Sequence, residues 1–166
     1  GRLINPMLAG GTLLDIGVYD IAFAHLVFGT EPKKITSTAY MGPTGVDEQA
    51  SMILEYDTGR FASLNCSFRL NMPCQASIYG TKGHINVPPM FFHPDKFKIK
   101  IGTEEEKEYT FERLGNGYTY EAIEVMNCLR EGKTESQIMP LSTSVSLMNI
   151  MDKIRKQWNL VYPMEK

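Results

Sequence analysis

The sequence contains few cysteines and histidines, and their spacing excludes the usual sites built from them. Its three cysteines, Cys66, Cys74 and Cys128, are an odd number, and none lies in a Cys-x-x-Cys arrangement. This pattern disfavours both a disulfide framework and a zinc site, and it favours a reducing, cytoplasmic setting. The three histidines also lack the spacing of metal ligands, so we expect no bound metal.

Long apolar runs and an excess of basic charge are missing as well. The longest apolar stretch, from Ile21 to Phe28, contains His25 and is much shorter than the roughly 20 residues needed to cross a bilayer. The formal net charge of -2 and a pI near 5.9 provide no basic field that would attract nucleic acid. We therefore expect neither a membrane nor a nucleic acid as a partner.

The chain begins at Gly1 without an initiator methionine and without a charged-plus-apolar signal segment. We expect it to be a piece of a longer protein. Its 166 residues, of which 43% are hydrophobic, suffice for one substantial core but are few for two domains. The length therefore predicts a single domain over residues 1–166.

The most informative stretch lies near the start of the chain. Gly10 and Gly11 allow a tight turn, and the apolar residues after them predict a largely buried helix over residues 15–28, ended by residues 29–32. Asp15 and Tyr19 are the polar exceptions. In an α-helix, residues at i and i+4 lie on one face, so the two polar ends can point into the same space and form a small site.

Each of these residues also has a structural alternative. Asp15 could cap the helix, and Tyr19 could be a partly buried aromatic residue with a satisfied hydroxyl. Gly17 inside the helix costs roughly 1 kcal/mol relative to alanine, which indicates that a ligand or a packed neighbour approaches the backbone closely. In the catalytic alternative, the Tyr19 hydroxyl exchanges a proton with an alcohol or carbonyl while a nearby cation stabilises its phenolate, and Asp15 orients the substrate or the tyrosine.

Beyond Pro32 the hydrophobic period changes from helical to alternating. Turn residues separate the alternating segments, so we predict strands joined as hairpins over residues 35–41, 49–56, 60–69, 75–79, 84–87, 96–101 and 109–111. Helical periodicity returns from Tyr118 to Gly132. A last helix, capped by Ser142 or Ser144, should bury Leu147, Met151, Ile154 and Trp158. Strands and helices do not alternate, which predicts an α+β fold with an open, predominantly antiparallel sheet and helices packed on one face.

One face of the segment 61–67 carries Phe61, Ser63, Asn65 and Ser67, which are almost uncharged. A sheet face exposed to water normally carries longer charged side chains, whereas small uncharged ones suit packing against another surface. We interpret this face as a subunit interface, with a solvated serine-rich face as the alternative.

The sequence lacks the usual means of binding a dinucleotide or a triphosphate by itself. No Gly-x-Gly-x-x-Gly follows a predicted strand, and Lys82 between Gly80 and Gly83 lacks the rest of a phosphate-binding loop. We interpret the segment 80–83 as an ordinary hairpin turn.

The segment Gly10-Gly11-Thr12-Leu13-Leu14-Asp15-Ile16-Gly17-Val18-Tyr19 resembles the start of the C-terminal domain in the glucose-fructose oxidoreductase and inositol dehydrogenase family, Gfo/Idh/MocA. Residues 44–47, 80–83, 117–121, 135–141 and 154–155 and the closing Tyr162-Pro163 are similar to later family blocks in the right order. The resemblance covers nearly the whole chain. Position 19 is a tyrosine, where inositol dehydrogenases have histidine. In this respect the sequence is similar to the dimeric dihydrodiol and NADP-dependent xylose dehydrogenases.

The resemblance implies specific roles for the residues near the start. Tyr19 would be the general acid/base, Asp15 its neighbour in the substrate site, and Gly17 a point where the nicotinamide of NAD or NADP comes close. It also implies a glyceraldehyde-3-phosphate dehydrogenase-like C-terminal domain that forms a homodimer through its open sheet face. A Rossmann domain would contribute the catalytic lysine and most of the cofactor site, and these 166 residues contain no such domain. We therefore expect them to be inactive alone.

Two functions follow from these observations. The chain is either the substrate-binding and dimerisation domain of an NAD(P)-dependent oxidoreductase of a sugar, polyol or diol, or a non-catalytic module that dimerises or binds through its sheet. In the second case Asp15 and Tyr19 would be structural residues, because a fold does not guarantee a function.

Overall fold

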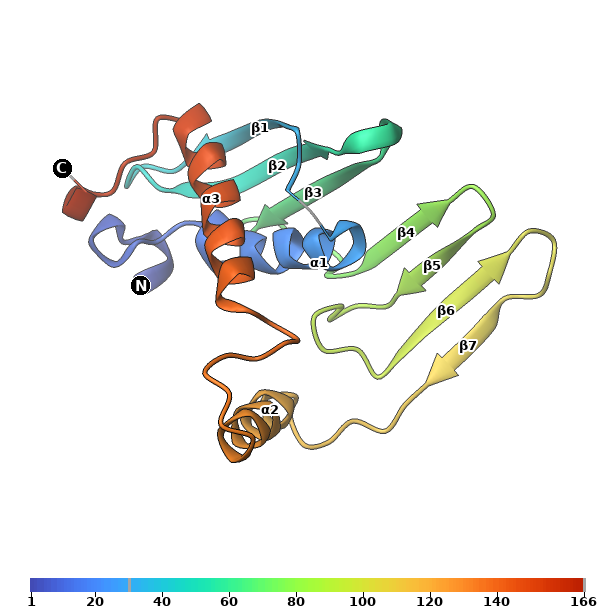
Figure 1. Cartoon of the computed structure of the whole chain (residues 1–166). Helices are drawn as coiled ribbons and strands as arrows, with labels where there is room; N and C mark the ends of the chain where they lie inside the picture. The colour runs from blue at the N-terminus through green and yellow to red at the C-terminus, as the bar shows by residue number, and fades with distance from the viewer. Residues whose placement is uncertain (30, 166) are drawn as a thin grey trace. The chain divides into compact units, whose positions relative to one another are not determined.

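The computed structural model describes residues 1–29 and 31–165 (Figure 1). The chain forms two compact units, Gly1–Asn71 with Met139–Lys166, and Met72–Ile138. Each unit contains its own antiparallel sheet. The α+β class with open antiparallel sheets is confirmed, and the strands divide between two sheets.

The sheet of the first unit consists of β1 (Lys34–Met41), β2 (Asp47–Glu55) and β3 (Phe61–Ser67), in that order. Leu54 pairs with Ile35 on one side and Ala62 on the other, so one face of the sheet is apolar. The turn Asp57–Gly59, a short 3-10 helix, joins β2 to β3. This is the hairpin that the sequence predicts at these residues.

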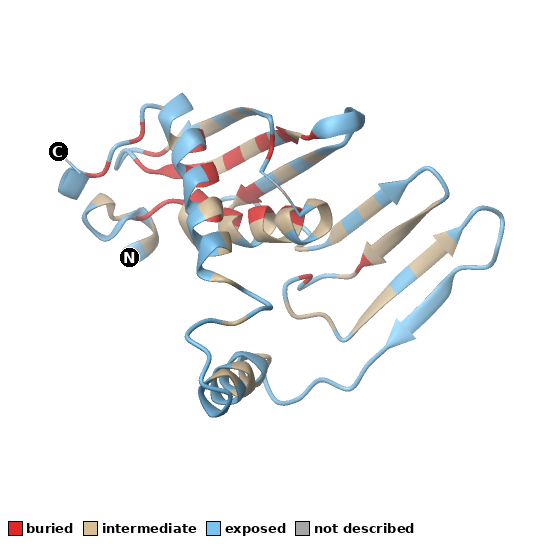
Figure 2. Cartoon of the chain, viewed as in Figure 1, coloured by how far each residue is buried: buried red, intermediate tan, exposed pale blue. Residues whose placement is uncertain are grey.

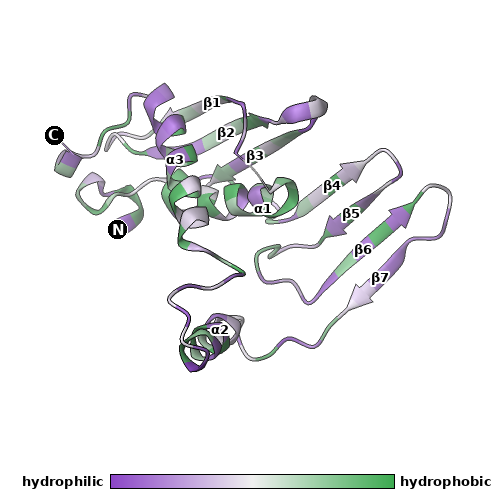
Figure 3. Cartoon of the chain, in the orientation of Figure 1, coloured by the Kyte–Doolittle hydropathy of each residue, from purple (hydrophilic) through white to green (hydrophobic). Residues whose placement is uncertain are grey.

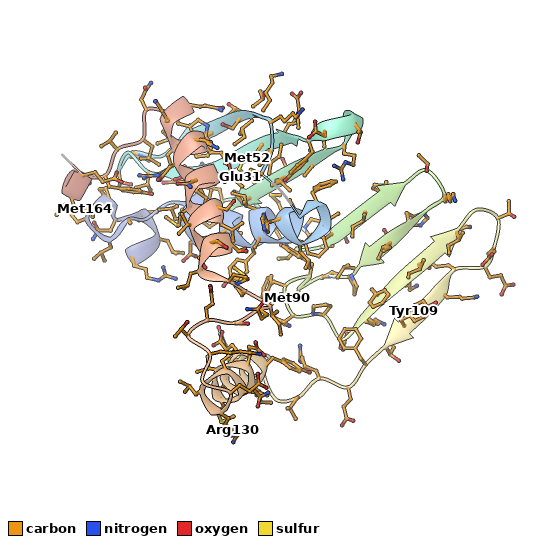
Figure 4. The ribbon with its side chains drawn as sticks, in the orientation of Figure 1. Glu31, Met52, Met90, Tyr109, Arg130 and Met164 are labelled. Atoms are coloured by element: carbon orange, nitrogen blue, oxygen red, sulfur yellow. The ribbon has the colours of Figure 1, made fainter. Side chains whose placement is uncertain are left out.

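Two helices cover the apolar face of this sheet. α1 (Val18–Phe28) and α3 (Leu141–Gln157) contact each other. In addition, α1 contacts β3, and α3 contacts β1. Figure 2 shows the buried residues concentrated on β2 and α1, and α3 adds Leu147, Met151 and Ile154 as the sequence predicts. Met52 lies in this core, and Glu31 at its edge accepts hydrogen bonds from Ser146 and Lys153 of α3 (Figure 4).

α1 ends at Gly29, whose positive φ of 66° lets its N–H bond to the His25 carbonyl at 2.7 Å. Part of the predicted stop signal, Thr30, lies outside the described residues. Short 3-10 helices flank the unit at both ends: Arg2–Ile4, Pro6–Leu8 and Pro163–Glu165.

The second unit contains β4 (Ala76–Gly80), β5 (Gly83–Val87), β6 (Lys96–Ile101) and β7 (Lys107–Thr110), paired in sequence order. Gly80 pairs with Gly83, so the segment around Lys82 is the predicted hairpin turn. The helix α2 (Tyr118–Arg130) follows, and none of its residues is buried.

The segment Pro6–Phe28 is long and apolar enough to cross a membrane by length and composition, a test that core helices and signal sequences also pass. Within it, Leu13, Ile21 and Ala24 pack into the cores of the first unit. That packing favours a core helix.

Candidate functional site

The candidate site begins with a turn that only glycine accommodates. The Gly11 N–H donates to the Leu3 carbonyl at 2.9 Å, and a side chain on Gly10 would collide with the backbone of Leu3 and Asn5. Gly11 has φ +129°, in the region that favours glycine. The tight turn predicted from the paired glycines is therefore confirmed.

The helical segment after this turn differs from the predicted one. Leu13–Gly17 form a single π-helical turn that continues directly into α1, so the segment starts at Leu13 with Thr12 as its N-cap. Asp15 is inside the π-turn, and its assignment as an N-cap is wrong. Because π-helical bonds join residues i and i+5, the α-helical i and i+4 argument does not apply across Leu13–Gly17.

Asp15 forms an ion pair within the first unit. Its Oδ1 lies 2.7 Å from Nη1 of Arg2, which belongs to the first 3-10 helix. The Asp15 side chain is 30% exposed, so the pair remains reachable from solvent. A carboxylate held by a guanidinium can still accept a hydrogen bond from a second partner.

Tyr19 lies in the first turn of α1, and 46% of its surface is exposed. Figure 3 shows α1 as hydrophobic over most of its length, and Tyr19 and Asp20 are among its polar exceptions. The structure thus places Asp15 and Tyr19 on one continuous segment, Asp15 in its π-turn and Tyr19 immediately after it. The exposure makes Tyr19 available to a molecule that approaches from outside.

Gly17 is buried and packs against β3. A Cβ at this position would lie 3.1 Å from Sγ of Cys66 and 3.2 Å from Cδ1 of Leu13, which is tighter than ordinary contact. Close packing therefore gives Gly17 a structural reason of its own. Its proximity to a nicotinamide stays a prediction.

Several buried polar groups beneath this segment were not singled out from the sequence. Asp47, at the start of β2, is fully buried and accepts a hydrogen bond from the Leu13 N–H at 2.7 Å. Burial raises the pKa of Asp47 to about 6, although backbone hydrogen bonds from Leu13, Asp47 itself and Thr12 act in the opposite direction. No local signal in the sequence separates Asp47 from Glu48 beside it, because both begin the same strand.

Asp20 and Cys66 add two more buried titratable groups. Burial raises the pKa of Asp20 to about 7. Burial, and secondarily the charge of Asp20, raise the pKa of the Cys66 thiol to about 12. Cys66 is therefore an inert core residue at neutral pH, which excludes it as a nucleophile.

The outward face of the first sheet matches the weakly polar face predicted from the sequence. Phe61 is 65% exposed, Ser63 and Asn65 are exposed, and Ser67 is half-buried. The neighbouring strand extends this face with Ser51, which donates a hydrogen bond to Asn65 at 2.7 Å. Its use as an interface stays a prediction at this point.

The described residues contain no group of three or more histidine, cysteine or acidic side chains able to hold a metal. The glycine-rich start of the helical segment does not fit a phosphate either, because the Asp47 carboxylate already accepts the N–H of Leu13 there. The Leu13 N–H at this helix start is therefore already occupied and is not available to a phosphate.

The sequence of the chain is similar to those of known proteins. The family model described as GFO/IDH/MocA C-terminal domain matches residues 2–86. The chain is 38% identical over 168 residues to trans-1,2-dihydrobenzene-1,2-diol dehydrogenase of Xenopus laevis, covering 98% of this chain and 51% of that protein. It is 35% identical over 173 residues to the human enzyme of the same name, covering 99% and 51%. The chain spans about half the length of the curated relatives it matches.

Solved structures share the fold at low sequence identity. The aldose-aldose oxidoreductase of Caulobacter crescentus, complexed with glycerol, matches with a TM-score of 0.81 and 18% identity over 94% of this chain and 48% of that one. Levoglucosan dehydrogenase, in complex with NADH and levoglucosan, matches with a TM-score of 0.71 and 17% identity over 90% and 48%. In both proteins the match covers about half of the solved chain.

Proposed function

Because the chain belongs to the Gfo/Idh/MocA family and matches its C-terminal domain, we propose that it is the substrate-binding and dimerisation domain of an NAD(P)-dependent oxidoreductase. The reaction would transfer a hydride between the nicotinamide and the hydroxyl-bearing or carbonyl carbon of a sugar, polyol or diol. The relatives named dihydrobenzenediol dehydrogenase favour a diol.

In this proposal the residues of the chain handle the proton. Tyr19 takes the proton from the substrate hydroxyl during oxidation and returns it to the carbonyl oxygen during reduction. Asp15, held by Arg2, accepts a hydrogen bond from a neighbouring substrate hydroxyl and so orients the reacting carbon. The cofactor supplies the hydride chemistry when bound, held mainly by a Rossmann domain of the whole protein.

The exposure of Tyr19 beside the ion-paired Asp15 is the observation that supports this function. Tyr56 and Tyr162 of the same unit are buried, whereas Tyr19 and Tyr40 are exposed. Of the two exposed tyrosines, Tyr19 is the one on the segment that carries Asp15. The site is also open to solvent, because both Tyr19 and the Asp15 side chain are partly exposed. An open half-site is what a divided active site requires.

The test is a Tyr19→Phe substitution in the full-length protein, assayed with NAD or NADP and trans-1,2-dihydrobenzene-1,2-diol or D-xylose. Loss of the hydroxyl should lower kcat by roughly 100-fold or more, because general acid/base catalysis contributes about that much. Tyr79→Phe, at an exposed tyrosine of β4, is the matched control and should keep kcat within about twofold. Near-normal turnover of Tyr19→Phe would contradict the catalytic role.

The outward face of the first sheet supports a homodimer, because its centre carries short uncharged side chains and exposed apolar ones such as Ile53 and Phe61. Cys66 and Cys128 form no disulfide, which supports a reducing, cytoplasmic location. A protein that dimerises normally but shows no turnover with any of these substrates would instead be the non-catalytic module.

A further inference from the structure

The helical segment that begins at Leu13 and carries Tyr19 is capped at its start by a residue distant in the sequence. The first N–H groups of a helix have no partner within the helix, and the N-cap Thr12 makes no side-chain capping bond. Instead Oδ2 of Asp47, from β2, accepts the Leu13 N–H at 2.7 Å in a buried position. Leu13 itself is fully buried, so this bond is shielded from water.

Gly11 allows Asp47 to come this close. The position that a Cβ on Gly11 would occupy is already taken by Oδ1 of Asp47, and the Tyr162 hydroxyl lies 3.3 Å from the same point. Two polar groups from distant parts of the chain therefore converge on the backbone of the turn. Any side chain at residue 11 would push the carboxylate away from Leu13.

Tyr162 holds the opposite side of the turn. Its hydroxyl donates a buried hydrogen bond to the Gly10 carbonyl at 2.7 Å. Its own N–H donates to Glu165 at 2.8 Å, and the Arg155 guanidinium lies over its ring at 5.1 Å while binding Glu165 at 2.9 Å. Tyr162 thus holds the turn by a hydrogen bond to the Gly10 carbonyl, and Asp47 holds it by a hydrogen bond from the Leu13 N–H.

A capping requirement alone does not account for a buried carboxylate. Burying a charge costs free energy unless hydrogen bonds compensate it, and the neutral hydroxyl of Thr12, which could cap one of these N–H groups, makes no capping bond here. Burial raises the pKa of Asp47 on balance, and its backbone donors, the Leu13 N–H among them, offset this only in part. These contacts make its placement directional.

The far end of the π-turn is fixed independently. Gly17 packs against Cys66 of β3 without room for a side chain. Asp15 and Tyr19 therefore belong to a segment anchored at Leu13 by Asp47 and at Gly17 by β3. A displacement at Leu13 would rotate or shift the turn that precedes Tyr19.

We propose that Asp47 is a positioning residue for Tyr19, acting through its buried hydrogen bond to the Leu13 backbone. Only the catalytic consequence of this role rests on the proposed function. Loss of the carboxylate loosens the π-turn first and the rest of the first unit later. Turnover then falls because the phenol is misplaced, while the affinity for cofactor is retained.

The test compares Asp47→Asn and Asp47→Ala with Met52→Ala, a buried residue of the same strand, in the full-length protein. Amide hydrogen exchange is followed in peptides covering residues 11–21 and 60–68. We expect at least tenfold faster exchange in 11–21 relative to 60–68 for Asp47→Ala, and at least threefold for Asp47→Asn, whose remaining carbonyl oxygen can still accept the Leu13 N–H. Met52→Ala should accelerate the two peptides equally. With the substrates named above, kcat should fall at least tenfold while KM for NAD or NADP changes less than threefold.

Three results would count against the proposal or its premise. Equal acceleration of both peptides in Asp47→Ala, as in Met52→Ala, would overturn it, and Asp47→Asn decides in the same way if Asp47→Ala does not fold. Selective acceleration with unchanged kcat would overturn the link to Tyr19. If the unsubstituted protein turns over none of the substrates, the proposed function fails, and selective exchange would still support Asp47 as the anchor of the helical segment. Asp47→Asn keeps one carbonyl oxygen, so the comparison remains valid if Asp47→Ala does not fold.

Discussion

Asp20 follows Tyr19 directly, and it is the residue whose ionisation most directly opposes folding of the first unit. Its Oδ2 is buried with no hydrogen-bond partner among residues 1–29 and 31–165, and burial raises its pKa from 3.8 to about 7. The folded state therefore binds a proton more tightly than the unfolded state. The contribution of Asp20 to the free energy of unfolding should fall as pH rises from about 4 to about 7.

The substitution Asp20→Asn removes this titration. The parent protein loses stability as pH rises and the variant does not. The free energy of unfolding of the variant, minus that of the parent, should therefore be larger at pH 8 than at pH 5 by on the order of 2 kcal/mol. One pKa unit corresponds to about 1.4 kcal/mol, and partial exposure reduces the full effect. Urea denaturation at both pH values measures the difference. Glu105→Gln, in an exposed turn, should show no such gain, and an Asp20→Asn curve parallel to the parent curve would refute the prediction.

At the scale of single elements, the apolar face of α3 should dominate the stability of the first unit. Ile154 is fully buried among residues of α1, β2 and β3. Ile154→Ala should lower the free energy of unfolding by about 3 kcal/mol, because the substitution leaves a cavity that the core fills only in part. Val145→Ala, at an exposed position of the same helix, should change it by less than about 0.5 kcal/mol in the same denaturation experiment.

The outward face of β3 gives a prediction about assembly. Ser63 is exposed at the centre of this face, opposite Ile53 of β2. Ser63→Arg places an unpaired charge in the proposed interface, so it should weaken dimerisation at least tenfold in sedimentation equilibrium of the full-length protein. Ser144→Arg, on the exposed surface of α3, should leave the dimer intact. A Ser63→Arg dimer of unchanged strength would remove this face as the interface.

Most elements could be predicted because their signals are local. The turn Asp57–Gly59, the hairpin at Gly80–Gly83 and the buried stripe of α3 follow from turn chemistry and from periods of two and 3.6 residues. The π-turn at Leu13–Gly17 could not be predicted this way, since no residue pattern separates it from an ordinary first helical turn. The division of strands between two sheets depends on contacts between strands, which periodicity does not specify.

For the candidate site, too, the local features could be predicted from the sequence and the long-range contacts could not. Asp15 and Tyr19 stand out locally as polar residues in an apolar segment, and the structure leaves Tyr19 exposed. Asp47 and Tyr162 act on the same segment from 34 and 152 positions away from their partners, and their roles appear only when the chain folds. For Gly17, the unusual glycine inside a helix correctly predicted that another group approaches the backbone closely, but the sequence did not say which group. In the structure the neighbouring residue is Cys66.

At the scale of the whole molecule, the proposed division of the active site between this chain and a nucleotide-binding domain gives the last prediction. Strand pairing within both described sheets is antiparallel, and the Asp47 carboxylate already accepts the N–H of Leu13 at the glycine-rich helix start near the candidate site. A dinucleotide's pyrophosphate needs free backbone donors at such a start. Residues 1–166 alone should therefore bind NADP weakly, with a Kd above about 1 mM, which corresponds to about -4 kcal/mol.

Isothermal titration of NAD and NADP into residues 1–166 and into the full-length protein tests this division. The full-length protein should bind at least 100-fold more tightly, and Tyr19→Phe should leave that affinity within about threefold, because the tyrosine handles the proton and not the cofactor. Micromolar binding by residues 1–166 would place a nucleotide site in this chain and refute the divided active site. Loss of cofactor affinity in Tyr19→Phe would instead assign Tyr19 to binding, so the two measurements separate a catalytic half-site from a cofactor site.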